Sequence, residues 1–198
     1  MKLLEPKFRR IVRFLAIPAV LIFVLSIAAM ASGSISLSYS GITVDEAGRL
    51  YLGRGGKIEV YEDGAVVQTI KPPVEKSFFF TLQDGNLLLS TGKETTTLDM
   101  DGALLETAED AEGALYASLK AQKHSCTAPD GTVYTLHREI LATQVTAEDG
   151  TVLYAEPVWA NALKPLLALA GLYVIFAAGY IALDRFATLE ATGHLDQV

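Results

Sequence analysis

Glu62-Asp63-Gly64-Ala65-Val66-Val67 is the stretch that indicates the fold, because it recurs twice further along the chain. The later copies are Met100-Asp101-Gly102-Ala103-Leu104-Leu105 and Glu148-Asp149-Gly150-Thr151-Val152-Leu153. Asp-Gly between β-forming residues marks a tight hairpin, since glycine readily adopts the positive φ that such turns need. The sequence therefore predicts three copies of an acidic hairpin.

A second acidic turn precedes each of these hairpins by 16, 17 and 19 residues, counted from glycine to glycine. The earlier turns are Asp45-Glu46-Ala47-Gly48, Gln83-Asp84-Gly85-Asn86 and Pro129-Asp130-Gly131-Thr132. Another turn lies between the two in each copy, as at Arg54-Gly55-Gly56-Lys57. Each copy therefore predicts four short antiparallel strands, which in the first copy lie at 38–44, 49–53, 57–61 and 65–70.

Two other segments shape this expectation. Phe78-Phe79-Phe80, in a strand expected at 77–82, is apolar on both faces, as in a fully buried strand. Residues 106–123 have the Ala/Glu/Leu/Lys composition of a short helix. We therefore expect one helix between the second and third copies.

The first copy resembles an NHL-type β-propeller repeat. In that family a Gly-x-Leu/Ile-Tyr strand is followed by an Ile-x-Val-aromatic strand, an Asp-Gly turn and an outer strand. The matching residues here are Gly48-Arg49-Leu50-Tyr51-Leu52, Lys57-Ile58-Glu59-Val60-Tyr61 and Asp63-Gly64. The resemblance extends over about 42–157, is weaker in the later copies, and implies an all-β, propeller-like domain without transferable catalytic residues. Propellers usually have ~4–8 blades, so three copies predict an open sector, a rearranged sandwich, or half of a six-bladed ring made by two chains.

Two apolar segments flank the repeats. Residues 14–31 are apolar except for Ser26, and residues 165–183 carry no charge. Both match the ~17–25 residues of a membrane-spanning helix. We therefore predict transmembrane helices at 14–31 and 164–183 with a β-repeat domain at 32–163 between them. Ala29-Met30-Ala31 also fits a signal-peptidase site, so the first segment is either a retained anchor or a cleaved signal peptide.

The basic residues predict the orientation. Residues 1–13 contain five Lys and Arg against one Glu, and such clusters stay on the cytoplasmic side. A two-pass cell-membrane protein would then have both termini in the cytoplasm, including the tail at 184–198, and its β domain outside. Small residues spaced along one face of the second segment are candidates for helix contact with the first segment or with another subunit: Gly171, Ala178 and Ala182.

The central region is acidic, with nine Lys and Arg against nineteen Asp and Glu over residues 32–163. Nucleic acid is therefore an unsuitable partner, because phosphate contacts need a basic surface. In an up-and-down sheet, the turns after the first and third strands lie at one end. We expect this end to form an acidic interaction surface of Asp45, Glu46, Glu62, Asp63, Asp84, Asp99, Asp101, Asp130, Glu148 and Asp149.

Apparent chemical motifs do not have the required spacing. Ser90-Thr91-Gly92-Lys93 lacks the earlier glycine of a phosphate loop and the helix that a serine acylase needs. His124, Cys126 and His137 lack a fourth zinc ligand, and Asp99-x-Asp101-Gly102 lacks the remaining calcium ligands. The sequence thus predicts no catalytic residue, no cofactor, no metal and no enzymatic activity.

These observations predict a non-catalytic, membrane-anchored interaction module: an accessory subunit, sensor or scaffold. Its partners would be membrane lipid and either another protein or a second copy of the chain. The alternative is an extracytoplasmic ligand-binding module for a glycan, peptide or metal. An exposed apolar patch or an unpaired edge strand would favour a protein partner, and an aromatic-lined pocket would favour a ligand.

Overall fold

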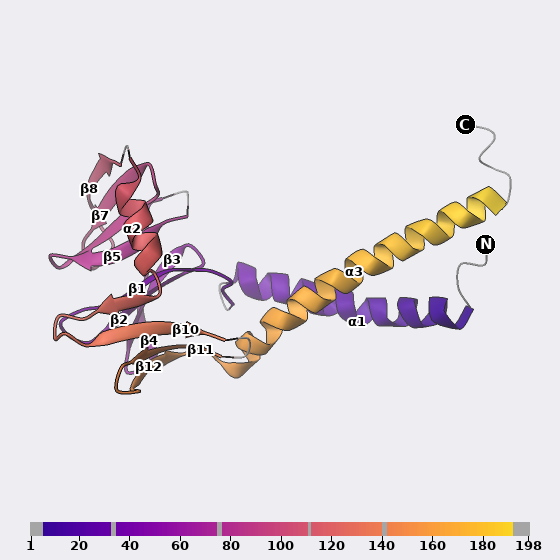
Figure 1. Ribbon diagram of the computed structural model, residues 1–198, viewed down its shortest axis with the longest axis horizontal. Helices are drawn as coiled ribbons and strands as arrows, with labels where there is room; N and C mark the ends of the chain where they lie inside the picture. Colours follow the sequence, from indigo (N-terminus) through magenta and orange to yellow (C-terminus); the bar gives the residue numbers. More distant parts are fainter. Residues whose placement is uncertain (1–5, 33–34, 75–76, 111, 140–141, 192–198) are drawn as a thin grey trace. The chain divides into compact units, whose positions relative to one another are not determined.

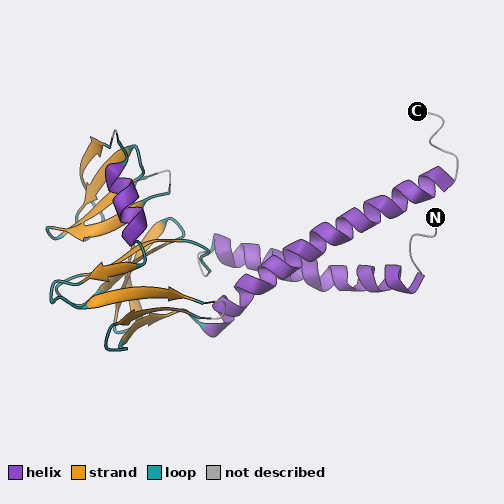
Figure 2. Cartoon of the chain, in the orientation of Figure 1, coloured by secondary structure: helices purple, strands orange, loops and turns teal. Residues whose placement is uncertain are grey.

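In the computed structural model, which describes residues 6–32, 35–74, 77–110, 112–139 and 142–191, the chain divides into two units. Residues 33–161 form one unit, the β domain, and residues 1–32 with 162–198 form the other, the helical unit. Figure 1 labels most of the elements, and Figure 2 shows strands in the first unit and long helices in the second. Parts of the expected cytoplasmic ends, residues 1–5 and 192–198, lie outside the described residues.

The β domain contains three four-stranded antiparallel sheets, as the repeats predicted. Sheet A consists of β1 (Tyr39–Val44), β2 (Leu50–Arg54), β3 (Lys57–Glu62) and β4 (Ala65–Ile70). Sheet B consists of β5 (Phe79–Gln83), β6 (Asn86–Ser90), β7 (Glu94–Leu98) and β8 (Leu104–Glu109). Sheet C consists of β9 (Ser125–Thr127), β10 (Val133–Arg138), β11 (Thr143–Ala147) and β12 (Val152–Ala155).

Two of the predicted Asp-Gly hairpins have a direct conformational explanation. Asp63 and Gly64 have φ of 51° and 77°, and Asp84 and Gly85 have φ of 50° and 74°. Two consecutive residues with positive φ form the turn whose twist matches that of antiparallel strands. Asp-Gly is favoured there because aspartate tolerates this region and glycine has no Cβ to clash.

Sheet A lies between the other two sheets. Its β2 residues Leu50 and Leu52 pack against Leu136 and Val145 of sheet C. The opposite face of sheet A contributes Tyr51, Ile58, Val60 and Ile70 to a second core with sheet B, whose members there are Phe78, Phe80, Leu87, Leu89 and Leu98. The order of the sheets is therefore B–A–C, with both faces of sheet A buried.

The first strands of the three sheets lie together, since β1 is in contact with both β5 and β9. This convergence fits a propeller-like arrangement. The outward face of sheet C is polar, because strand alternation places Thr135 and Thr146 on it, whereas the outward face of sheet B carries Leu88 between Thr81 and Thr97. A two-chain, six-bladed ring would have to bury the polar face of sheet C, which does not favour that arrangement.

The segment 106–123 differs from its prediction. Its first part belongs to β8, and the helix is limited to α2 (Ala114–Gln122), which follows Gly113 in a left-handed conformation. The Ala/Glu/Leu/Lys composition favours a helix, but the first part of the segment forms a strand because it pairs with β7 from Glu94 to Leu98. Helix α2 contacts β5, β6 and β1 and supplies the crossover that takes the chain from sheet B to sheet C.

The prediction for the Phe78-Phe79-Phe80 run is confirmed in part. Phe78 and Phe80 are buried in the core between sheets A and B. Phe79, on the opposite face, is half-buried and is covered by Tyr116 of α2, with 4.9 Å between the ring centroids. The apolar run therefore signals a strand covered by a sheet on one side and by a helix on the other.

The helical unit consists of α1 (Pro6–Ala31) and most of α3 (Val158–Ala191). Residues Arg10–Ala31 and Val158–Leu183 are long and apolar enough to cross a membrane, by length and composition. Helix α3 begins earlier than 164, where the sequence predicted its start, so Pro165 lies inside the helix. The early start is explained by hydrogen bonds from the Ala160 and Asn161 N–H groups to the Pro157 carbonyl.

Contact between α1 and α3 involves a different face of α3 from the predicted one. Gly171 lies against α1, where an added Cβ would be 3.5 Å from Phe23, but Ala178 and Ala182 are exposed. The buried small residues are instead Ala170 and Ala177. The contact includes a 2.8 Å hydrogen bond from the Tyr173 hydroxyl to the Val12 carbonyl. Tyr173 lies three residues after Ala170 and four before Ala177, so all three residues are on the helix face that contacts α1.

Candidate functional site

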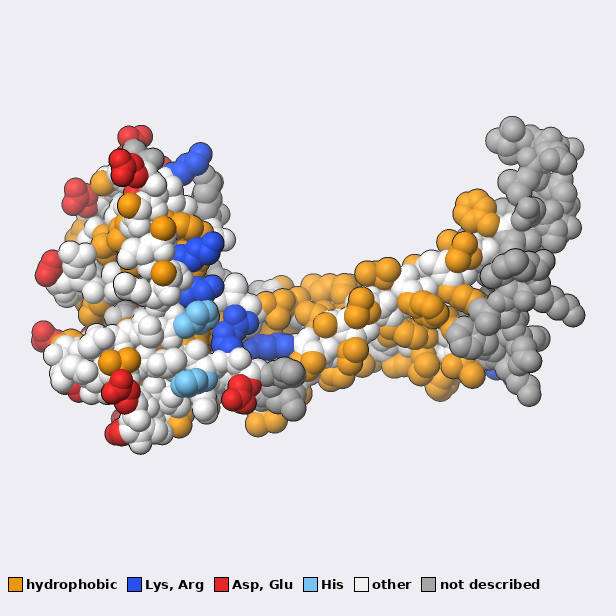
Figure 3. All heavy atoms as spheres, viewed as in Figure 1, with side chains coloured by type: hydrophobic (Ala, Val, Ile, Leu, Met, Phe, Trp, Pro, Cys, Tyr) orange, Lys and Arg blue, Asp and Glu red, His pale blue; other side chains and the backbone are white. Residues whose placement is uncertain are grey.

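The predicted acidic residues lie in six turns, two at the same end of each sheet. Figure 3 shows Asp and Glu side chains along one side of the β domain and most Lys and Arg side chains towards the opposite side. Eight of the ten predicted acidic residues are exposed, whereas Asp45 is buried and Asp99 is half-buried. The acidic surface therefore consists mainly of the other eight carboxylates.

Several of these aspartates stabilise their own turns. The Asp45 Oδ1 accepts hydrogen bonds from the N–H groups of Ala47 and Arg49, at 3.0 and 2.9 Å. Asp99 Oδ1 accepts from Asp101 and Ala103 in the same pattern. Asp130 and Asp149 each accept one such bond, from the threonine two residues later. Turn geometry thus explains why aspartate repeats at these positions.

The backbone hydrogen bonds also affect ionisation. The N–H of Thr151 holds the pKa of the Asp149 carboxyl below its usual value. Asp149 therefore remains charged and exposed while its contact with Thr151 fixes its position. The acidic end therefore presents negative charges from turns of defined conformation.

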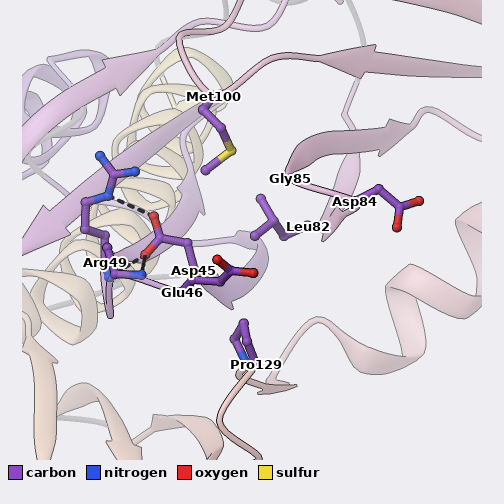
Figure 4. A pocket seen from close by; sticks show the side chains of 9 residues that line it. Asp45, Glu46, Arg49, Leu82, Asp84, Gly85, Met100 and Pro129 are labelled. Carbon is purple, nitrogen blue, oxygen red and sulfur yellow. Dashed lines mark hydrogen bonds and ion pairs between the residues drawn. The ribbon is translucent and has the colours of Figure 1, made fainter.

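Turns from all three sheets converge around a pocket of about 550 Å³ at this end (Figure 4). The β1–β2 turn contributes Asp45, Glu46, Ala47 and Arg49. Sheet B contributes Leu82, Asp84, Gly85 and Met100, and sheet C contributes Pro129. Asp45 and Pro129, which are 84 positions apart in sequence, are therefore brought to one concave surface.

The pocket combines an acidic rim with apolar walls. Asp45 is neutralised by Arg49, whose Nε lies 2.8 Å from the Asp45 Oδ2. Glu46 and Asp84 are exposed and retain negative charge at the rim, while Leu82, Met100 and Pro129 supply apolar surface (Figure 4). Such a surface suits the apolar stem and cationic head of a lysine or arginine side chain. The sequence analysis identified the acids but missed these three apolar residues, which lie in or beside the turns.

A buried polar cluster joins sheets A and C and was not identified from the sequence. The Arg54 Nε lies 2.5 Å from Glu59 Oε2, and its Nη1 donates to the Tyr154 hydroxyl at 3.2 Å. Glu59 also accepts from the Tyr61 hydroxyl and from Lys57, each at 2.7 Å. The network satisfies charges that burial would otherwise make costly.

The cluster also includes residues beside the first and the last strand of the β domain. Glu156, which follows β12, is buried; one of its oxygens lies 4.0 Å from Arg54 Nη1 and the other accepts from Tyr39 at 3.5 Å. Tyr39 begins β1, so the first strand of sheet A is joined to the residue that follows the last strand of sheet C. Arg138 lies over the Tyr39 ring, 5.4 Å from its centroid.

Burial governs the ionisation of this cluster. It raises the pKa of Tyr154 to about 12 and also raises the pKa values of Tyr39 and Tyr61. Burial also opposes the ionisation of Glu59, but hydrogen bonds from Arg54, Lys57 and Tyr61 outweigh it, so the pKa of Glu59 lies below its usual value. At neutral pH the tyrosines are therefore neutral donors and Glu59 is an ionised acceptor.

Acid is expected to destabilise the β domain partly through Glu59. Because the pKa of Glu59 is lower in the folded state, its contribution to stability is present above the unfolded pKa and is lost as the pH falls through the folded pKa. Between about pH 6 and about pH 3, the unfolding free energy of Glu59→Gln should therefore fall less than that of the wild type. Urea unfolding of the full chain in detergent at each pH measures the difference. Equal pH dependence for the two proteins would contradict the assignment.

The three residues considered as zinc ligands do not form a site. Cys126 is half-buried against the core between sheets A and C, and burial raises the pKa of its thiol to about 11. His137 is exposed, and burial lowers the pKa of His124. Within the described ranges, no group of three or more His, Cys, Asp and Glu residues is arranged to hold a metal ion.

No protein-family model matches the chain, and no curated protein matches it, so the resemblance to NHL-type repeats remains a prediction. Among solved structures, the chain is similar to a protein of unknown function from Bacteroides caccae, with 16% identity over 60% of this chain and 45% of that one and a TM-score of 0.31. Two structures of virginiamycin B lyase from Staphylococcus aureus are also similar. A catalytically inactive form with quinupristin has 15% identity over 58% and 39% of the two chains and a TM-score of 0.31. A selenomethionine-substituted form has 14% identity over 56% of this chain and 38% of that one, with a TM-score of 0.32.

The chain spans less than half the length of these solved chains, and at such identities the likeness concerns the fold alone. It nevertheless corrects one prediction. The sequence analysis excluded enzymatic activity, but two of the three similar structures are of an enzyme, so that exclusion is wrong. The chain is thus an all-β domain of three four-stranded sheets in a propeller-like arrangement, with two helices that could cross a membrane.

Proposed function

We propose that the chain is a two-pass membrane protein whose β domain lies outside the cytoplasm and binds a protein partner through its acidic end. The pocket formed by turns of sheets A, B and C is the observation on which the proposal rests. Its exposed Glu46 and Asp84 and its apolar Leu82 and Met100 suit a basic side chain inserted by the partner.

Exposed apolar residues next to the acidic end support a protein rather than a small ligand at this surface. Val66 and Val67 of β4 are 49% and 52% exposed, and Leu104 and Leu105 of β8 are 55% and 56% exposed. Each pair follows an acidic turn closely, so the apolar groups adjoin the negative charges. Together with the outer position of β4 and β8 in their sheets, this arrangement is typical of surfaces that bind another polypeptide.

The membrane topology is supported by the basic residues before α1 and by the length of both apolar helices. Single cysteines in a Cys126→Ser background test it. A membrane-impermeant thiol reagent should label Glu148→Cys in sealed cells and label Gly193→Cys only after lysis. The reverse result would place the β domain in the cytoplasm and end the proposal.

The partner site is tested by photo-crosslinking in the native membrane. A photoreactive residue at Ala47, which lines the pocket, should form a discrete protein adduct, whereas one at the exposed Ala121 of α2 should not. The double change Glu46→Gln and Asp84→Asn should reduce the Ala47 adduct by about fivefold or more, since complementary charge governs such contacts. The matched control Glu94→Gln and Glu139→Gln removes the same charge at the opposite end of the sheets, where both side chains are exposed, and should leave the adduct unchanged. Equal losses in both double variants would reject the pocket as the binding site.

A further inference from the structure

A second pocket lies at the opposite end of the β domain. It has a volume of about 610 Å³ and is formed by the beginnings of β1 and β5, the β2–β3 turn and α2. The first strand of sheet A and the first strand of sheet B contribute Tyr39 and Phe79, and α2 contributes Tyr116 and Lys120. It shares no residue with the pocket at the acidic end.

The walls of this second pocket are aromatic. Phe79 and Tyr116 are half-buried, with ring centroids 4.9 Å apart, and Phe78 and Tyr39 complete the aromatic lining. Val74 adds apolar surface. The walls can therefore hold an apolar or aromatic body, as ligand pockets commonly do.

The described lining of the pocket carries positive charge. Lys120 and Lys123 line it, and no Asp or Glu is among the described residues that do so. Lys123 Nζ lies 5.6 Å from the centroid of the Phe79 ring, so its ammonium group is held over the aromatic wall. Within the described part of the chain, neither lysine forms an ion pair with a carboxylate. Lys57 in the buried cluster differs, because it pairs with Glu59.

Hydroxyl groups and an open turn complete the site. Ser38, Ser40 and Ser77 line the pocket and can donate hydrogen bonds to an oxyanion. Gly55 and Gly56 form the tight β2–β3 turn with φ of 59° and 77°, and nothing lies within 4 Å of a Cβ added at either position. The turn therefore leaves this side of the pocket unobstructed.

From this arrangement we infer that the pocket binds a phosphate ester carried on an apolar or aromatic body. Two lysines and three serines match the charge and the several acceptor oxygens of a phosphate group. Such a group can come from a soluble organic phosphate or from the headgroup of an anionic phospholipid. Both sources are relevant, because the chain carries two helices that could hold the domain at a bilayer.

Lysine protection in the full chain tests the inference and separates the two sources. An amine-acylating reagent is applied and modification of each lysine is followed by mass spectrometry. One arm adds phenyl phosphate to the protein in uncharged detergent. The other compares nanodiscs of phosphatidylcholine with nanodiscs that also contain phosphatidylglycerol. Lys71 and Lys93, which are exposed and do not line the pocket, serve as internal controls.

Selective protection of Lys120 and Lys123 in at least one arm is the expected result, and the arm that protects identifies the source of the phosphate. The double change Lys120→Gln and Lys123→Gln should weaken phenyl phosphate binding, measured by titration calorimetry, by about tenfold or more if that arm protects. The matched change Lys71→Gln and Lys93→Gln should not. Absence of protection in both arms, or equal protection of the control lysines, would overturn the inference. Either outcome is independent of the partner test at the acidic end.

Discussion

Replacing Arg54 by methionine is expected to destabilise the β domain by about 3–5 kcal/mol, because it removes the buried cation shared by Glu59 and Glu156 and leaves Glu59 with the more exposed Lys57. The side chain of Arg54 is 11% exposed and that of Glu59 is 5% exposed, so their ion pair is shielded from solvent. The matched change Arg49→Met removes another arginine of the same sheet. The Arg49 side chain, which pairs with Asp45, is 34% exposed. The expected loss of unfolding free energy is therefore about 1 kcal/mol or less.

Cys126 provides the measurement. It is the single cysteine of the chain and packs against the core between sheets A and C, the interface that the Arg54 cluster joins. Pulse labelling of its thiol across a urea gradient, on the full chain in detergent, gives the unfolding free energy of each variant. Equal midpoints for Arg54→Met and Arg49→Met would show that the cluster does not stabilise the interface.

The sequence could predict the number of sheets but not their order. Asp-Gly turns and strand lengths define each four-stranded unit locally, so the strands of sheet A were predicted to within about one residue. Which unit packs on which depends on both faces of sheet A at once. The alternation Leu50-Tyr51-Leu52 indicates two apolar faces, yet it does not say that sheet B covers one and sheet C the other.

The polar cluster was missed for the same reason. In a sheet with one solvated face, Glu59 would point to water, and Arg54 looks like part of a basic turn. Only the packing of sheet C on that face of sheet A buries both residues. The acidic surface was easier to predict, because its residues belong to local turns whose side-chain hydrogen bonds span two to four residues.

The interface between sheets A and B predicts a second large effect. Phe80 is 3% exposed and packs over β1 and β2, so Phe80→Ala should cost about 3–5 kcal/mol. Gly53 makes this close approach possible, since a Cβ added there would lie 2.6 Å from Phe80 Cε1 and 2.9 Å from Ser40 Cβ. Gly53→Ala should therefore cost about 1–3 kcal/mol through overpacking.

The two changes should not be additive. Without the Phe80 ring, the shorter of the two clashes disappears and only the contact with Ser40 remains, so Gly53→Ala should cost less in the Phe80→Ala background. A double-mutant cycle, measured by the same Cys126 labelling, should give a coupling of about 1 kcal/mol or more. Gly171→Ala is a suitable control, because its added Cβ would lie 3.5 Å from Phe23 in the helical unit and has no contact with Phe80. Additivity of Gly53→Ala with Phe80→Ala would mean that sheet B does not pack on sheet A through this ring. The B–A–C order, on which the convergence of the acidic turns depends, would then have to be abandoned.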